Sequence, residues 1–148
     1  MKKLAAAAVA ALVFAPAAFG HAHMTPPIVV KKASDLFALA VPTEKDGLTT
    51  TEIELTVPDG FRIDSFVAAP GWTRTTETSG SGEEVIVKSV KWTGGAVPTG
   101  EDSVFQVLAA PDSAKTYEFS VRQTYSDGSV VNWSGPESSD QLTTDPSE

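Results

Sequence analysis

Apolar and polar residues alternate along much of the chain that follows residue 34. In residues 51–57 every second side chain is apolar, namely Ile53, Leu55 and Val57. The same period of two recurs in residues 116–125, and it is typical of strands with one face in a core and the other in solvent. These segments are therefore predicted to be half-buried strands.

Turn-forming residues separate the strand-like segments from one another. They form the groups Pro58-Asp59-Gly60, Pro70-Gly71, Ser79 to Gly82, Gly94-Gly95, Pro98-Thr99-Gly100 and Ser126 to Ser129. Strands are predicted at residues 35–41, 51–57, 61–69, 72–78, 84–92, 103–109, 116–125 and 130–133. About seven to eight short strands with no helix between them indicate an all-β chain folded as an antiparallel β-sandwich. The chain after Gly135 is predicted to be irregular.

The first 22 residues follow another pattern and are predicted to be a cleaved signal peptide. Lys2 and Lys3 precede an apolar stretch at residues 4–14, and small residues follow. That stretch is too short to span a bilayer, so the mature protein is expected to have no membrane span and to be periplasmic or secreted. Residues 23–136 are predicted to form one domain, and residues 137–148 a polar, acidic tail.

Both histidines of the chain lie at the end of this signal. A cut after Ala18-Phe19-Gly20 releases His21 as the first residue, and a cut after Gly20-His21-Ala22 releases His23. Either cut leaves a free α-amine and an imidazole on one Cα atom. Two such nitrogen donors form a chelate that suits Cu(II), so processing itself would create a metal site.

Charge and cysteine content narrow the classes of partner. The formal net charge is −8, and loss of Lys2 and Lys3 with the signal lowers it to −10. An acidic domain repels phosphate backbones and anionic headgroups, which argues against nucleic acid and membrane surfaces as partners. There is no cysteine, which excludes disulfides, thiolate zinc sites and a blue-copper site. A bound metal must therefore use nitrogen and oxygen ligands.

Several spaced segments together resemble the YcnI family of bacterial exported copper-binding proteins. They are His23-Met24-Thr25, residues 41–46 (VPTEKD), Pro70-Gly71-Trp72, residues 90–93 (VKWT), Pro98-Thr99-Gly100-Glu101 and residues 123–135 (QTYSDGSVVNWSG). The resemblance covers nearly the whole mature chain. It implies an immunoglobulin-like β-sandwich that binds Cu(II) through a mono-histidine brace, in which the first residue supplies its amine and its imidazole.

The same resemblance implies a set of site residues. His23 is the brace, Glu101 adds a carboxylate, and Trp133 lies beside the metal. Glu44, in the VPTEKD segment, is the rival carboxylate. The expected function is that of an exported copper chaperone or sequestration protein, whose partners are the copper ion and other copper-handling proteins of the cell envelope.

Three other readings compete with this one. If the cut follows Gly20, His21-Ala22-His23 forms an amino-terminal Cu/Ni motif that binds through the amine, two backbone amides and the imidazole of His23. A lytic monooxygenase needs a further histidine from the body of the fold, and none follows His23. No enzymatic activity is therefore expected. An immunoglobulin-like binding or adhesion module without a metal is the remaining alternative.

Overall fold

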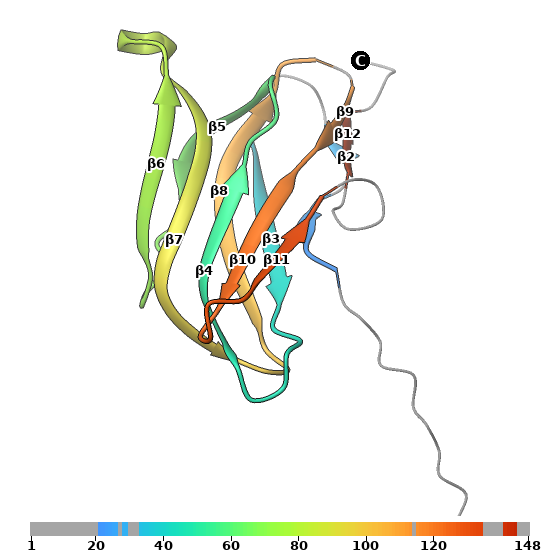
Figure 1. Ribbon diagram of the computed structural model, residues 1–148. Helices are drawn as coiled ribbons and strands as arrows, with labels where there is room; N and C mark the ends of the chain where they lie inside the picture. The colour runs from blue at the N-terminus through green and yellow to red at the C-terminus, as the bar shows by residue number, and fades with distance from the viewer. Residues whose placement is uncertain (1–20, 27, 30–32, 114, 135–140, 145–148) are drawn as a thin grey trace, which may run out of the picture.

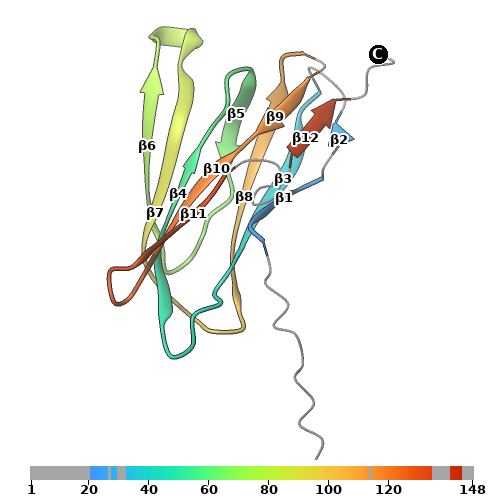
Figure 2. The same ribbon diagram turned by 45° about the vertical axis from the view of Figure 1, so that its right-hand side comes forward.

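The computed structural model describes residues 21–26, 28–29, 33–113, 115–134 and 141–144. Two antiparallel sheets pack face to face, as Figures 1 and 2 show from two directions. The predicted all-β, antiparallel β-sandwich is confirmed. Within the described residues the one helical element is a short 3-10 turn, η1 (Gly82–Glu84), between two strands.

The first sheet has four strands in the order β1-β3-β8-β5. Their bounds are β1 (His23–Thr25), β3 (Asp35–Pro42), β8 (Asp102–Pro111) and β5 (Phe61–Phe66). In β3 the inward side chains are those of Phe37, Leu39 and Val41, all 3% exposed or less. This alternation sets the register, because Leu39 must lie opposite another core residue, Phe105 of β8.

The second sheet has five strands in the order β11-β10-β4-β7-β6. Their bounds are β11 (Val130–Trp133), β10 (Ser120–Tyr125), β4 (Thr49–Thr56), β7 (Ile86–Pro98) and β6 (Thr73–Ser79). Asp127 and Gly128 make the turn between β10 and β11, as predicted, and Gly128 has a φ of 84°. Strands β1 and β11 are both edge strands, one in each sheet.

Aromatic side chains fill the space between the two sheets. Trp92 of β7 stacks on Phe105 of β8 with ring centroids 4.1 Å apart. Phe61 meets Phe37 edge to face at 5.0 Å and Phe119 at 4.9 Å. Edge-to-face and offset contacts of this kind add to the stabilisation from apolar burial, and the Trp92–Phe105 pair provides it across the two sheets.

Two elements differ from the sequence-based expectation because the chain changes sheet. Residues 116–125 form two strands, β9 (Thr116–Glu118) and β10, interrupted at Phe119. Strand β9 belongs to a small third sheet in the order β2-β12-β9, with β2 (Ile28–Val29) and β12 (Gln141–Thr144). The prediction that the chain is irregular after Gly135 is therefore wrong for residues 141–144. Alternation shows that a segment is a strand, but it does not identify the neighbouring strand.

Gly94 and Gly95 do not form a connection between two strands, which the sequence predicted. Both glycines lie inside β7, where the pairing with β4 shifts register. Gly94 has a φ of 85°, and a Cβ atom at Gly95 would overlap the ring of Trp72. The two glycines thus permit a bulge and a close contact with the Trp72 ring, and the strand continues through them.

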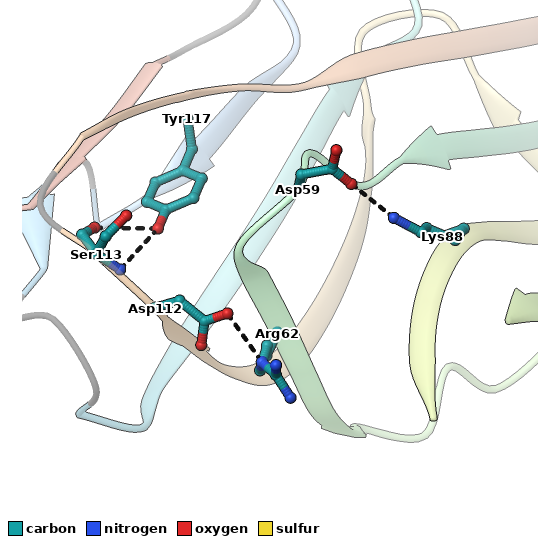
Figure 3. A network of polar contacts seen from close by, with 6 residues as sticks. All are labelled: Asp59, Arg62, Lys88, Asp112, Ser113 and Tyr117. Atoms are coloured by element: carbon teal, nitrogen blue, oxygen red, sulfur yellow. Dashed lines mark hydrogen bonds and ion pairs between the residues drawn. The ribbon is translucent and has the colours of Figure 1, made fainter. Parts of the chain in front are cut away.

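Two charged pairs on the outside of the sandwich are short and exposed to solvent. Figure 3 shows both, Lys88 Nζ with Asp59 Oδ1 at 2.6 Å and Arg62 Nε with Asp112 Oδ2 at 2.9 Å. The hydrogen bond and charge of Lys88 lower the pKa of Asp59 below its ordinary value. A lowered carboxyl pKa stabilises the fold above the ordinary pKa, and this contribution is lost as the pH falls through the folded-state value.

Replacement of Lys88 by methionine should therefore raise the pKa of Asp59 toward that of an unperturbed carboxyl group. A carboxyl-detected NMR titration measures the change directly. The pKa of Asp127, which hydrogen bonds from Ser129 hold down, should stay where it is and serves as the control. An unchanged Asp59 pKa would contradict the assigned cause. The effect on stability should be small, because both partners are exposed to solvent.

Candidate metal centre

His21 lies against Trp133, where the edges of the two sheets meet. The ring centroids are 6.0 Å apart with an interplanar angle of 60°. In Figure 1 the blue N-terminal segment lies beside the end of β11. Ala22 is 1% exposed and belongs to the core, so the chain is already packed in place one residue before β1 begins.

His23 has a different environment from His21. It is partly buried and pairs with Ala40 of β3, and its Nδ1 is 3.1 Å from the carbonyl oxygen of His21. Its strand neighbour Met24 points into the core at 2% exposure. The ring contact with Trp133, which the resemblance assigned to the neighbourhood of the brace, is thus made by His21.

The indole of Trp133 is fixed by a hydrogen bond as well as by packing. It is 8% exposed, and its Nε1 donates to Oε1 of Gln123 at 3.1 Å. Gln123 in turn donates from Nε2 to the carbonyl oxygen of Pro42 at 2.9 Å. These bonds connect the end of β11 to the end of β3.

Glu101, the predicted carboxylate, lies in the turn between β7 and β8. Its backbone N–H donates to Pro98 O at 3.2 Å, and its carbonyl oxygen accepts from Thr43 N at 3.0 Å. Its side chain is exposed. The backbone of Glu101 therefore lies close to the segment that carries Glu44, while its carboxylate is in solvent.

Glu44, the rival carboxylate, follows β3 by two residues and is partly buried. Its backbone N–H donates to the hydroxyl of Tyr125 at 3.3 Å. Its Oε1 is buried and has no hydrogen-bond partner among the residues that the structure describes. An unpaired buried carboxylate oxygen costs free energy, and a bound cation would remove that cost.

No group of three or more His, Cys, Asp or Glu side chains is placed to hold a metal ion in the described part of the chain. A mono-histidine brace has only two such side chains, since its third donor is the α-amine. Residues 1–20, which carry most of the predicted signal peptide, lie outside the described ranges. Among the helices of the described residues, none is long and apolar enough to cross a membrane.

Residues 21–147 match the family model of a domain of unknown function, DUF1775. The chain belongs to the DUF1775 family. This confirms the resemblance to the YcnI family that the sequence segments indicate. The match begins at His21, the residue that packs against Trp133.

A curated relative of this DUF1775 chain is the copper-binding protein CutI of Bacillus subtilis (strain 168). The two sequences are 30% identical over 132 residues, which cover 87% of this chain and 62% of the relative. The chain thus spans less than two thirds of the length of that protein.

Two solved structures are similar to the DUF1775 chain. An uncharacterized protein from Nocardia farcinica with an immunoglobulin-like fold is 29% identical and has a TM-score of 0.64, over 82% of this chain and 97% of that one. A cohesin module from a Clostridium perfringens family 33 glycoside hydrolase is 9% identical with a TM-score of 0.51, over 84% and 97% of the two chains. The cohesin likeness shows the fold alone.

Gln123 is the residue of this candidate site that the sequence-based prediction missed. It occupies an inward position of β10, between the buried Val121 and Tyr125, and is itself 0% exposed. A polar residue at an inward position of an alternating strand is an unusual choice, because buried polar groups need partners. That signal was present in the sequence and could have identified it.

Proposed function

We propose that this protein is an exported Cu(II)-binding protein that sequesters copper or delivers it to a partner, and that His21 is its first residue after processing. The supporting observation is the packing of Ala22 and His21. A cut after Gly20 keeps Ala22 in the core and His21 against Trp133, whereas a cut after Ala22 removes both. The brace then consists of the amine and imidazole of His21, in place of those of His23.

The planar amino-terminal Cu/Ni geometry of His21-Ala22-His23 fits this fold poorly. It would bind the ion through the backbone nitrogens of Ala22 and His23, so the first residues would have to wrap around the ion. Ala22 would then leave the core, and His23 would lose its pairing with Ala40. Chelation by the amine and imidazole of one residue leaves the strand in place.

We propose Glu44, and not Glu101, as the carboxylate that joins the brace. Its buried, unpaired Oε1 is the feature that a cation would complement, and nitrogen and carboxylate donors suit Cu(II). Hydrogen bonds link the Trp133 indole to Pro42, two residues before Glu44. We propose binding without catalysis, because His23 lies only two residues after His21 and does not supply a second imidazole from the body of the fold.

A matched pair of variants tests the function and the choice of carboxylate together. In the chain that begins at His21, Cu(II) titration should give one ion per chain. Glu44→Gln should weaken binding about tenfold or more, equivalent to about 1.4 kcal/mol, and should change the Cu(II) EPR spectrum. Glu101→Gln, the control, should change neither.

If Glu101→Gln weakens binding and changes the EPR spectrum while Glu44→Gln does neither, Glu101 is the ligand. No copper binding by the parent chain would remove the proposed function and favour the metal-free binding module. Circular dichroism of each variant verifies that the fold is intact, so that a loss of binding is assigned to the site.

A further inference from the structure

A buried side-chain amide joins the two sheets beside the proposed copper site. Gln123 of β10 accepts from Trp133 Nε1 at 3.1 Å and donates to Pro42 O at 2.9 Å and to Thr50 Oγ1 at 2.8 Å. Trp133 and Thr50 belong to the five-stranded sheet, and Pro42 ends β3 of the four-stranded sheet. The amide therefore links two sheet ends that are also connected by the bond from Glu44 N to the Tyr125 hydroxyl.

The orientation of this amide follows from its partners. An indole N–H can only donate and a backbone carbonyl can only accept, so Oε1 of Gln123 must face Trp133 and Nε2 must face Pro42. Thr50 Oγ1 also lies 2.7 Å from Thr43 Oγ1. The polar contacts thus extend from the Trp133 indole to Thr43, the residue that directly precedes Glu44.

The groups that hydrogen-bond to Gln123 are themselves buried, so they depend on this partner. The Trp133 side chain is 8% exposed, and Thr43 and Thr50 are 2% and 0% exposed. An apolar side chain at position 123 would leave the indole N–H and the Pro42 carbonyl oxygen without this partner. Buried polar groups that lose a partner move or admit water, because the unpaired state is costly. Loss of Gln123 should therefore displace the Trp133 indole, which contacts His21, and the end of β3 at Pro42.

We propose that Gln123 is a positioning residue for the copper site. It holds the Trp133 indole against His21, and it fixes the end of β3 from which the Glu44 segment continues. It touches neither the ion nor the imidazole. This inference rests on the proposed function, since it concerns the geometry of the same site.

Gln123→Met in the chain that begins at His21 tests this role, with two readouts. Methionine preserves the length of the side chain and removes its hydrogen bonds. In the copper-free protein, the indole N–H resonance of Trp133, identified by its loss in Trp133→Phe, should shift upfield and exchange faster with solvent. Cu(II) affinity should fall by about tenfold, as is common when groups that orient a metal site are removed, and the EPR spectrum should change.

Tyr117→Phe is the matched control for a general loss of stability. The Tyr117 side chain is 1% exposed, and its hydroxyl donates to Ser113 O at 3.0 Å, as Figure 3 shows. Its ring contacts Phe61, which pairs with Pro111, whereas Pro42 pairs with Asp102 at the other end of β8. Tyr117→Phe should therefore lower stability while leaving the Trp133 resonance and the Cu(II) affinity unchanged.

The possible outcomes distinguish a failure of this inference from a failure of the proposed function. A parent chain that binds no Cu(II) overturns the proposed function and the inference with it. A parent that binds copper, together with a Gln123→Met variant of equal affinity and unchanged Trp133 resonance, overturns the inference alone. If Tyr117→Phe changes the Trp133 resonance and the Cu(II) affinity as much as Gln123→Met does, the inference is also overturned. If Gln123→Met does not fold, Thr50→Val removes one acceptor of the amide and should shift the same resonance in the same direction; no shift would count against the proposal.

Discussion

A chain that begins at His21 is expected to bind Cu(II) on the order of a hundredfold more tightly than the same chain with one extra residue before His21. The difference corresponds to about 2.7 kcal/mol. The extra residue converts the α-amine of His21 into a peptide nitrogen, so the amine and imidazole on one Cα atom no longer form the chelate. The fold should not change, because Ala22 and the strand pairing of His23 remain in both forms.

Competition titration against a chelator of known affinity, with both forms side by side, measures this difference. His21→Ala in the chain with the correct terminus should lose affinity to a similar extent, whereas His23→Ala should retain tight binding. A chain that begins at His23 lacks Ala22 and the ring contact with Trp133, so it should bind more weakly than the His21 form. Tightest binding by the His23 form would show that the family brace is His23, as the sequence resemblance implies. If the chain that begins at His21 and the chain with one extra residue bind Cu(II) equally, the α-amine of His21 is not a ligand.

The strands were predictable because their inward positions follow a simple period. Phe37, Leu39 and Val41 alternate with less buried residues, and this pattern is visible without any structure. The order of the strands was not predictable in this way. A period of two gives the face of each residue, whereas the partner strand depends on packing between segments far apart in the chain.

The proposed metal site was only partly predictable for the same reason. The sequence identifies an N-terminal histidine, a tryptophan and two candidate glutamates, but it does not show which of them lie close together. The contact between His21 and Trp133 joins residues near opposite ends of the chain, at the edges of different sheets. The choice between Glu44 and Glu101 depends on burial of one carboxylate oxygen, which follows from the tertiary structure alone.

Phe61→Ala is expected to be among the most destabilising single substitutions in the core, at about 3–5 kcal/mol. The Phe61 side chain is 1% exposed and meets three other rings, those of Phe37, Phe119 and Tyr117, at 4.9 to 5.8 Å. Alanine leaves a cavity that these neighbours cannot fill, because Phe37 is held by β3 and Tyr117 by β9 of the small third sheet. Urea denaturation of the copper-free protein measures the change in the free energy of unfolding.

The same variant tests whether the core and the copper site are energetically separate. Phe61 pairs with Pro111 at one end of β8, and the proposed site lies toward Pro42 and Asp102 at the other end. Phe61→Ala should therefore bind Cu(II) with unchanged affinity at temperatures well below its unfolding transition. Leu36→Ala, at a position that is 45% exposed, is the control and should cost far less stability. A Phe61→Ala protein that stays folded but loses copper affinity would show that the site depends on the packing of the whole sandwich, and not on the local contacts of His21, Trp133 and Gln123.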